Sequence, residues 1–263
     1  MADPTPNPTT RLQHDRKQEI YLLALRDGSV EVAELAERFG VTTETIRRDL
    51  SDLQANGRLR RVHGGAVPLE RVHHEPMVTA RDRQQAAEKV RIAEAAVEDV
   101  PLSGTVIIDS GSTLERLAAV FPVDRDLHVV TNSLRSALTL ARRGVERLTV
   151  LGGGVNTNTF AMVDAFTLDT VRELSVDVLF VSCDGLSFRR GLTTPYRVES
   201  MVKRAMIDAA SRVVALADHS KLGNDQLFAY AGLDELDVLV TDTGASPGDV
   251  ERLRCHELEL RVV

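Results

Sequence analysis

Six short apolar runs recur at regular intervals in the second part of the chain, and each ends in small or polar residues. The runs are GTVIID (104–109), LHVVTNS (127–133), LTVLGGG (148–154), DVLFVSCDG (177–185), RVVALADHS (212–220) and DVLVTDT (237–243). Segments with helical spacing separate the runs, and the amphipathic pattern AAEKVRIAEAAVEDV precedes the first. Apolar strands that alternate with helices are typical of a parallel sheet covered on both faces. The pattern predicts an α/β domain over residues 86–263.

Small polar residues gather where the predicted strands end. Residues 109–113 (DSGST) join a strand to a helix, and Asn132 and Gly153 follow the next two strands. In open parallel sheets ligands bind beyond the carboxyl ends of the strands, where glycines, free amides and hydroxyls suit an anion. A phosphorylated small molecule fits this pattern, although ordinary strand–helix turns need the same residue types. The GSTL sequence is neither a P-loop nor GxGxxG, so nucleotide binding is not indicated.

Three short helices are predicted in the first seventy residues. Residues 14–27, 31–39 and 43–55 carry apolar side chains at helical spacing, and glycine or Asn-Gly follows each of them. Thr42 can cap the third helix. Three short helices joined by tight turns fit a helix-turn-helix. The next segment, RLRRVHGGAV, predicts a β-hairpin with Gly64 and Gly65 at its turn.

A small basic patch lies on the third helix and this hairpin, in a chain that is acidic as a whole. The net charge of the chain is −7, whereas residues 45–67 hold five arginines against Asp49 and Asp52. Arginine binds phosphates and guanine edges, so the patch indicates a DNA-binding surface. The alternative is chance clustering on a solvated face. The predicted DNA contacts are Thr42, Thr43, Thr45, Arg47, Arg48, Arg58, Arg60, Arg61 and His63.

Composition argues against several classes of protein. No apolar run approaches the length of a transmembrane helix, and the start, MADPTPNPTT, lacks the basic and apolar regions of a signal peptide. Cys183 and Cys255 form no CxxC pair, so we expect neither a disulfide framework nor a zinc site. His73 and His74 are adjacent, and no further ligand pattern supports them as a metal site. We expect no bound metal, no membrane association and a cytoplasmic location.

Changes in composition along the chain divide it into four segments. Residues 68–85 are polar and contain Pro68 and Pro76, which is typical of a hinge between domains. We therefore expect a disordered tail, a DNA-binding domain, a linker and an α/β domain. Their predicted bounds are residues 1–13, 14–70, 71–85 and 86–263.

Over about residues 14–243 the chain resembles the DeoR family of bacterial transcriptional regulators. The segment VEVAELAERFGVTTETIRRDLSDLQANGRLRRVHGGA is similar to the winged helix-turn-helix of that family, with TIRRDL and RVHGGA at the family's spacing. VIIDSGSTLERLA, VVTNS, LTVLGGG, GLTTPYRVESMVKRAM and ALADHSKLG resemble its C-terminal sensor domain. The resemblance implies a Rossmann-like domain related to ribose-5-phosphate isomerase, which senses a phosphorylated carbohydrate.

The resemblance also implies roles for individual residues of the sensor domain. It assigns the phosphate to Ser110, Gly111, Ser112 and Thr113. It assigns sugar or phosphate contacts to Asp109, Asn132, Gly153, Asp184 and Lys221, with Glu199 and Lys203 near the same site.

The chain departs from the family's pattern at Glu31, at Asp164 and at the segment that holds Cys183 and Asp184. Glu31 stands where a Ser or Thr usually caps the second helix, and Glu is a poorer cap. Asp164 stands where the family commonly has glycine, and a carboxylate near the pocket would repel a phosphate or bind sugar hydroxyls. Cys183 and Asp184 replace part of a Gly-rich stretch, which can alter the choice of ligand.

The function that the resemblance implies is repression of genes for carbohydrate uptake and catabolism. The expected partners are double-stranded operator DNA and a phosphorylated carbohydrate, with a fructose phosphate favoured, and the expected assembly is a homodimer or homotetramer. No cofactor and no catalytic residue are expected. One alternative is a sugar-phosphate isomerase with an attached DNA-binding module, although the chain lacks most of the acid- and glycine-rich segments of such isomerases. The other is a ligand-dependent activator.

Overall fold

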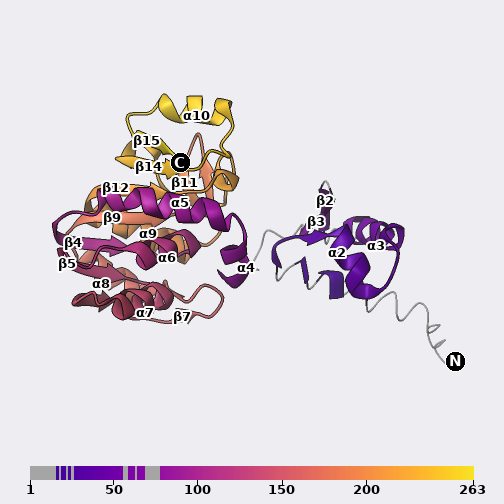
Figure 1. Cartoon of the computed structure of the whole chain (residues 1–263), viewed down its shortest axis with the longest axis horizontal. Helices are drawn as coiled ribbons and strands as arrows, with labels where there is room; N and C mark the ends of the chain where they lie inside the picture. The colour runs from indigo at the N-terminus through magenta and orange to yellow at the C-terminus, as the bar shows by residue number, and fades with distance from the viewer. Residues whose placement is uncertain are drawn as a thin grey trace. The chain divides into compact units, whose positions relative to one another are not determined.

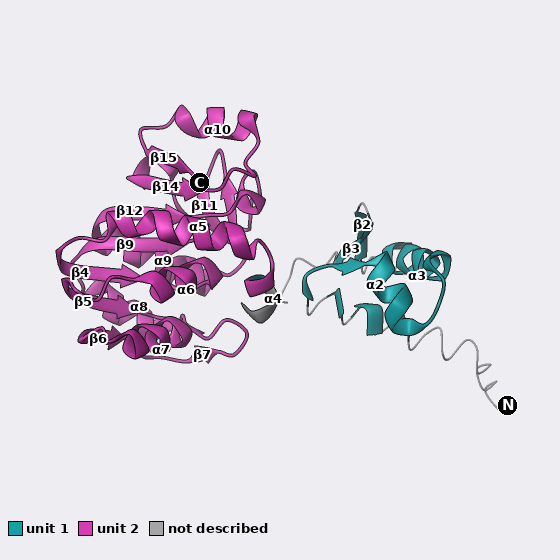
Figure 2. Ribbon diagram, in the orientation of Figure 1, with its two compact units in different colours: residues 1–81 teal, residues 82–263 magenta. Residues whose placement is uncertain are grey.

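A computed structural model of the chain separates it into two compact units, residues 1–81 and 82–263, shown in different colours in Figure 2. The structure describes residues 16–17, 19–21, 23–24, 27–55, 59–62, 64–68 and 78–263. Each unit has an apolar core of its own, so each is described by itself.

The first unit is a small helical domain with a three-stranded sheet. The described residues between 16 and 27 are helical, and Gly28 forms a bend after them. The further elements are β1 (Val30–Glu31), α2 (Val32–Phe39), α3 (Thr43–Ala55), β2 (Leu59–Val62) and β3 (Gly65–Pro68). The strands are antiparallel in the order β1-β3-β2. Ile20, Leu35, Ile46, Leu50 and Leu59 are buried together in its core, which confirms the expected helix-turn-helix followed by a hairpin.

Two local predictions in this unit can be compared with the structure: the hairpin turn at Gly64 and Gly65, and the poor helix cap at Glu31. Gly65 belongs to β3 rather than to the turn, and a Cβ there would overlap the carbonyl oxygen of Val30 in β1. Glu31 is the N-cap of α2 and makes no capping bond with its side chain, as expected. The start of α2 is nevertheless fixed, because the amide of Val32 donates to the carbonyl of Gly64 at 2.9 Å.

The second unit contains a seven-stranded, wholly parallel sheet in the order β15-β14-β12-β9-β4-β5-β6 (Figure 1). The strands are β4 (Ser103–Ile108), β5 (Asp126–Thr131), β6 (Arg147–Val150), β9 (Val176–Ser182), β12 (Ala210–Leu216), β14 (Val238–Thr241) and β15 (Glu259–Val262). Each of the six predicted runs overlaps one of these strands, so the predicted α/β fold with a mainly parallel sheet is confirmed.

Helices cover both faces of this sheet. The helices of this unit are α4 (Val78–Arg83), α5 (Ala86–Ala96), α6 (Ser112–Val120), α7 (Leu134–Arg143), α8 (Ala165–Arg172), α9 (Arg197–Ala209) and α10 (Pro247–Arg254), with short 3₁₀ turns η1 (Val97–Asp99), η2 (His219–Lys221) and η3 (Leu233–Glu235). Side chains alternate along β4, so Val106 and Ile108 pack with α5 and α6, whereas Ile107 packs with α8 and α9. Because both faces are buried, the strands are apolar along most of their length.

Three features of this unit were not predicted. β15 adds a seventh strand, and β7 (Val155–Asn156) and β8 (Ala161–Met162) form a small hairpin. β10 (Gly185–Ser187), β11 (Gly191–Thr194) and β13 (Phe228–Ala231) form a separate antiparallel sheet. The run 177–185 therefore divides between β9 and β10, with Cys183 and Asp184 between them.

The direction in which the chain adds strands to the sheet changes between β4 and β9. The chain passes from β4 outward to β5 and β6, and then returns to the other side of β4 to form β9, β12, β14 and β15. The loops that follow β4 and β9 consequently diverge at the carboxyl edge. In open parallel sheets ligands commonly bind beyond the carboxyl ends of the strands at such a switch in strand order.

Candidate functional site

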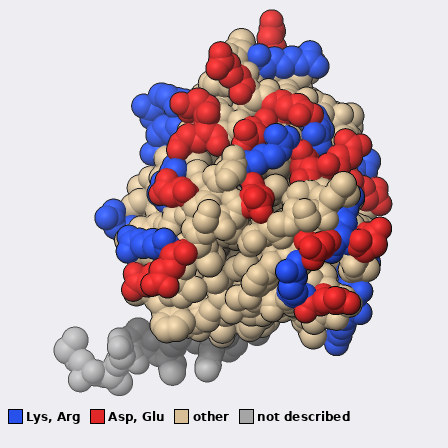
Figure 3. All heavy atoms as spheres, turned by 90° about the vertical axis from the view of Figure 1, so that its left-hand side faces the viewer, with Lys and Arg blue, Asp and Glu red and all other residues tan. Residues whose placement is uncertain are grey.

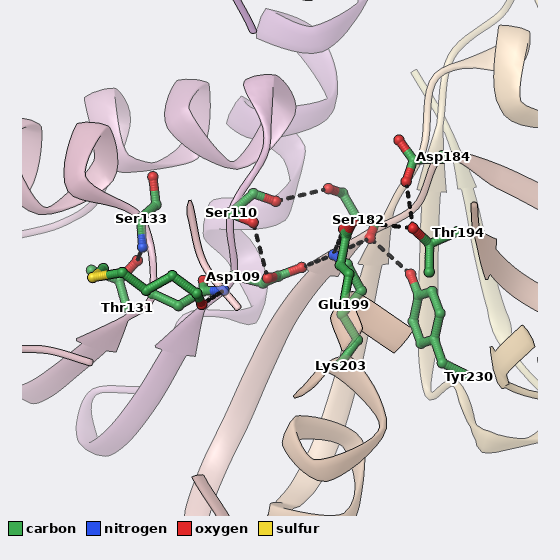
Figure 4. Close-up of polar contacts among 12 residues, drawn as sticks. Asp109, Ser110, Thr131, Ser133, Ser182, Asp184, Thr194, Glu199, Lys203 and Tyr230 are labelled. Atoms are coloured by element: carbon green, nitrogen blue, oxygen red, sulfur yellow. Dashed lines mark hydrogen bonds and ion pairs between the residues drawn. The ribbon is translucent and has the colours of Figure 1, made fainter. Parts of the chain in front are cut away.

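A buried lysine joins the loops after β4 and β9 at this switch in strand order (Figure 4). Lys203, on α9, forms an ion pair with Asp109, the first residue after β4, and both side chains are almost wholly inaccessible. Its ammonium group also donates to the carbonyl of Ser182, the last residue of β9, at 3.0 Å. Glu199, one turn earlier on α9, lies 3.5 Å from the same nitrogen. One cation is thus shared by two carboxylates and a carbonyl.

The surroundings of Lys203 keep it charged. Burial by itself lowers the pKa of the ammonium group, but the charges of Asp109 and Glu199 outweigh burial, so the net pKa is raised. The Tyr230 ring centroid lies 5.7 Å from the Lys203 nitrogen. At Tyr230, by contrast, burial is the main cause of a raised pKa. The Tyr230 hydroxyl therefore stays protonated, and it donates to the Ser182 carbonyl at 2.8 Å.

A buried threonine extends this cluster to a third carboxylate. The hydroxyl of Thr194, the last residue of β11, lies 2.9 Å from Asp184 and 3.1 Å from Glu199 (Figure 4). A hydroxyl has one proton, so it can donate fully to only one of the two carboxylates at a time. Asp184 and Glu199 are half-buried, and they are the members of the cluster that are open to solvent.

The loop between β4 and α6 approaches β9 closely. Gly111 has φ +136°, and a Cβ there would lie 2.6 Å from the hydroxyl of Ser182. Gly111 is the N-cap of α6 and has no side chain with which to satisfy the first amides of the helix. Ser110, Ser112 and Thr113 are buried beside it. A helix start with this character has a partial positive charge and suits an anion.

Asn132, after β5, is wholly buried at the same edge of the sheet. Its amide nitrogen donates to the carbonyl of Met162 at 3.3 Å, whereas its Oδ1 has no hydrogen-bond partner among the described residues. The neighbouring Ser133 is the N-cap of α7 and accepts from the amide of Ser136 at 3.2 Å. A buried acceptor without a partner is uncommon, and a ligand hydroxyl or a water molecule would satisfy it.

Gly153 lies apart from the lysine cluster, in an exposed loop after β6 that Asp164 holds. Asp164 is the N-cap of α8, accepting from the amides of Thr167 at 2.9 Å and Gly154 at 2.5 Å. The Gly154 amide and then the Thr167 amide are the main causes of a lowered pKa at Asp164. The oxygens of Asp164 thus hold the loop after β6 on the start of α8, and the expectation that this carboxylate would repel a phosphate or bind sugar hydroxyls stays a prediction.

Lys221 lies in η2, after β12, with a half-buried side chain and no ion-pair partner among the described residues. It is close enough to Cys183 for its charge to oppose the rise in the pKa of that thiol, which burial nevertheless raises to about 12. The Cys183 thiol is therefore protonated and unreactive at neutral pH. Lys221 remains an available cation near the start of the loop that carries Asp184.

The residues of α3 that are predicted to contact DNA lie on its solvent-facing side. Ile46 and Leu50 are wholly buried, whereas Thr43, Arg47 and Arg48 are exposed. Thr45 is half-buried. Thr42 caps the helix as predicted, because its hydroxyl accepts from the amide of Thr45 at 3.2 Å.

The hairpin adds two described arginines to this surface. Arg60 and Arg61, on β2, are exposed, and the Arg61 guanidinium lies 3.3 Å from the hydroxyl of Ser51 on α3. The hairpin and α3 thus belong to one basic surface. Arg58 and His63, also predicted, lie outside the described residues.

Three residues of the lysine cluster were not predicted from the sequence. Ser182 ends a predicted strand, so the rule that ligands bind at strand ends could have found it. Thr194 and Tyr230 lie on β11 and β13 of the antiparallel sheet, and nothing in the sequence pattern indicated that sheet. Within the described ranges no group of three or more His, Cys, Asp and Glu residues could hold a metal ion, and no helix is long and apolar enough to cross a membrane.

Comparisons with known proteins match both units. The family model described as "DeoR-like helix-turn-helix domain" matches residues 16–72, and the one described as "DeoR C terminal sensor domain" matches residues 84–243. The HTH-type transcriptional regulator GlpR of Haloferax volcanii is 34% identical over 231 residues, which cover 88% of this chain and 90% of that protein. The glycerol-3-phosphate regulon repressor of Escherichia coli is 30% identical over 254 residues, covering 95% and 99%.

Among solved structures, ribose 5-phosphate isomerase A of Methanocaldococcus jannaschii is similar to part of the chain. The two are 16% identical, and the match covers 52% of this chain and 55% of that one with a TM-score of 0.39. A similarity this weak supports no conclusion about this chain.

Proposed function

This chain belongs to the DeoR family of transcriptional regulators, and from that premise we propose that it is a repressor whose affinity for operator DNA is controlled by a phosphorylated carbohydrate. The observation that carries the proposal is the combination, in one chain, of a helix and hairpin that expose arginines with a sheet edge suited to an anion. The relatives named as regulators match both parts of this combination over most of their length.

Operator binding is proposed for α3 and the hairpin. α3 would enter the major groove with Thr43, Thr45, Arg47 and Arg48, and Arg58, Arg60, Arg61 and His63 would contact the backbone. Thr42 acts here mainly through its cap, which fixes the start of α3. By contrast, on the face shown in Figure 3 the Lys and Arg side chains are interspersed with Asp and Glu. A surface of mixed sign has no general attraction for phosphate backbones.

Effector binding is proposed for the carboxyl edge around β4 and β9. The phosphate would bind at the start of α6, on the amides and hydroxyls of residues 110–113, with Lys221 as an available cation. The sugar hydroxyls would bind the open carboxylates of Asp184 and Glu199 and the unpartnered oxygen of Asn132. Asp109 and Lys203 would fix the positions of these side chains from the buried side of the site. Gly153 is proposed only as an outer contact, because it lies apart from the cluster.

A thermal-shift panel of phosphorylated sugars tests the effector site. A ligand present at about 100 times its Kd stabilises the native state by about 2.7 kcal/mol, which raises the Tm by several degrees. We expect one phosphosugar to raise the Tm and its unphosphorylated parent to leave it unchanged. Fructose 1-phosphate, fructose 6-phosphate and glycerol 3-phosphate are the first probes, and fructose phosphates are favoured. A panel without any shift would contradict the effector site.

The sign of regulation is tested with a reporter gene behind the operator. We propose repression, for which removal of the regulator raises expression. A fall in expression would instead identify an activator. We also propose a homodimer or homotetramer located in the cytoplasm, on the nucleoid when DNA is bound, and light scattering of the purified protein measures the assembly.

An isomerase reaction is the competing function, because carboxylates and an ammonium group meet at the edge of the sheet. We propose that no reaction occurs here and that no cofactor is needed. Lys203 and Asp109 are inaccessible and paired with each other, so neither is placed to exchange a proton with a substrate. Incubation with ribose 5-phosphate followed by a ketose assay would reveal any turnover.

A further inference from the structure

The start of the sensor unit is tied by side chains to three loops at the carboxyl edge. This entry segment, residues 82–89, includes the end of α4 and the first turn of α5. It follows directly on the first unit, and the chain passes between the two units only once. Any signal carried along the backbone from the effector site to the DNA-binding unit must therefore pass through the entry segment.

The first tie is an ion-pair node of three side chains. Arg135 lies 2.7 Å from Asp82 of α4 and 2.9 Å from Glu115 of α6. Arg135 is the second residue of α7, directly after the loop of Asn132, and the amide of Glu115 donates to the carbonyl of Gly111 at 2.9 Å. The node thus joins α4 to the starts of the two helices that follow β4 and β5.

The second tie is a buried lysine of α5. Lys89, whose side chain is 4% exposed, donates to the carbonyl of Gln84 at 2.7 Å and lies 3.9 Å from the carboxylate of Asp218. Asp218 is the second residue after β12, and its carboxylate also accepts from the amide of Ser220 in η2 at 3.1 Å. This tie joins the turn between α4 and α5 to the loop that carries Lys221.

Two observations indicate that the entry segment can change its arrangement. Gln85, in the turn between α4 and α5, has φ +51°, a left-handed conformation that is uncommon for a residue other than glycine. In the node, Oδ1 of Asp82 and Nη1 of Arg135 are buried and have no partner among the described residues. Buried polar atoms without partners are costly, so a small displacement of α6 or α7 can favour a different set of hydrogen bonds.

We propose that the entry segment is the output element of the sensor domain, and that the Asp82–Arg135–Glu115 node and the Lys89–Asp218 tie transmit effector occupancy to it. The inference depends on the proposed function, because the three loops to which the segment is tied are those assigned to the effector. The effector shifts the equilibrium only if its affinity differs between two arrangements of these ties.

The Asp82→Asn variant tests the node, because it removes the charge and leaves the shape of the side chain nearly unchanged. Operator affinity is measured with and without fructose 1-phosphate, fructose 6-phosphate or glycerol 3-phosphate, and the binding of the same probes is measured by calorimetry. We expect the variant to bind the active probe within about threefold of the wild type. The probe should change operator affinity at least tenfold less in the variant than in the wild type.

Two further variants make this result specific. Asp169→Asn removes an exposed ion pair of α8, with Arg172 at 3.3 Å, and should behave as the wild type in every measurement. Asp82→Glu keeps the charge and should restore most of the response. Hydrogen exchange of residues 78–89 gives an independent readout, because the active probe should change it in the wild type and not in Asp82→Asn.

The outcomes separate this inference from the function on which it rests. If the wild type responds to a probe and folded Asp82→Asn responds equally, the entry segment is not the output element. If Asp82→Asn does not fold, the hydrogen exchange of the wild type still decides, because unchanged exchange of residues 78–89 on probe binding overturns the inference. If operator binding by the wild type responds to none of the probes, the proposed function itself is contradicted.

Discussion

At the scale of single residues, the carboxyl edge depends on charges that compensate one another. Asp109 and Lys203 are both inaccessible, and each is the nearest opposite charge of the other. A buried ion pair adds little net stability, but the loss of one partner leaves an uncompensated charge inside the protein. The pair therefore acts mainly to fix the loops after β4 and β9 in one arrangement.

The Lys203→Met variant should show this dependence. It leaves the carboxylate of Asp109 buried without a cation, so we expect the free energy of unfolding to fall by about 3–5 kcal/mol in urea titrations. The double variant Asp109→Asn/Lys203→Met removes both charges and should recover much of the loss. A decrease of less than about 1 kcal/mol in the single variant would show that the pair is not structurally important.

The capping role of Asp164 predicts a particular dependence of stability on pH. Its pKa is lowered in the folded state, chiefly by the Gly154 amide, so its contribution is complete above the ordinary pKa of 3.8. The contribution is lost as the pH falls through the lowered value. Asp164→Asn can still cap α8 but does not titrate. We expect the Tm difference between wild type and variant to be largest at neutral pH and to shrink towards pH ~3; a constant difference would contradict the assignment.

At the scale of elements, the site is built from the loop between β4 and α6 packed against the end of β9. The close approach of the two at Gly111 and Ser182 leaves no room for a side chain. This contact brings the start of α6 to the lysine cluster. The same sheet edge gathers the loops after β5 and β12, so one short stretch of edge holds all but the outermost predicted effector residue, Gly153.

Gly111→Ala tests whether this approach is needed for binding. The new Cβ would meet the Ser182 hydroxyl, and φ of +136° is unfavourable for alanine, so we expect a loss of stability of about 1–3 kcal/mol and at least tenfold weaker binding of the active phosphosugar. Gly144→Ala is the matched control. It also has a positive φ, +90°, but no atom lies within 4 Å of the Cβ that alanine would add, so it should lose stability and keep binding. Equal binding by both variants would disprove the role of the β4–α6 loop.

The sequence predicted the elements that follow a simple periodicity and missed those that depend on tertiary contacts. The six parallel strands are near-continuous apolar runs, which is why they could be located. β15 has exposed or half-buried residues at the edge of the sheet, and the antiparallel sheet consists of strands of three or four residues. Thr194 and Tyr230 come from that sheet, so their contacts with the site could not be predicted. Asp164 was located by comparison with the family pattern, but its role as a cap depends on the position of the loop around Gly154.

At the scale of the whole molecule, the proposed DNA-binding surface on α3 and the hairpin belongs to one unit and the proposed effector site to the other. The first unit is small and carries exposed arginines on α3 and β2. The second is a doubly covered parallel sheet with a polar edge at the switch in strand order. Each unit has a core of its own, so regulation requires a free-energy coupling between two separate binding events.

Measuring the operator affinity of the full chain in the presence of phosphosugars tests this coupling most directly. DNA selected by the protein from a random library serves as the operator, and its Kd is measured by fluorescence anisotropy at fixed salt, because salt alone changes DNA affinity. We expect one phosphosugar to weaken binding to the selected sequence at least tenfold and its unphosphorylated parent to have no effect. Selected DNA that binds equally well with every phosphosugar would contradict this expectation.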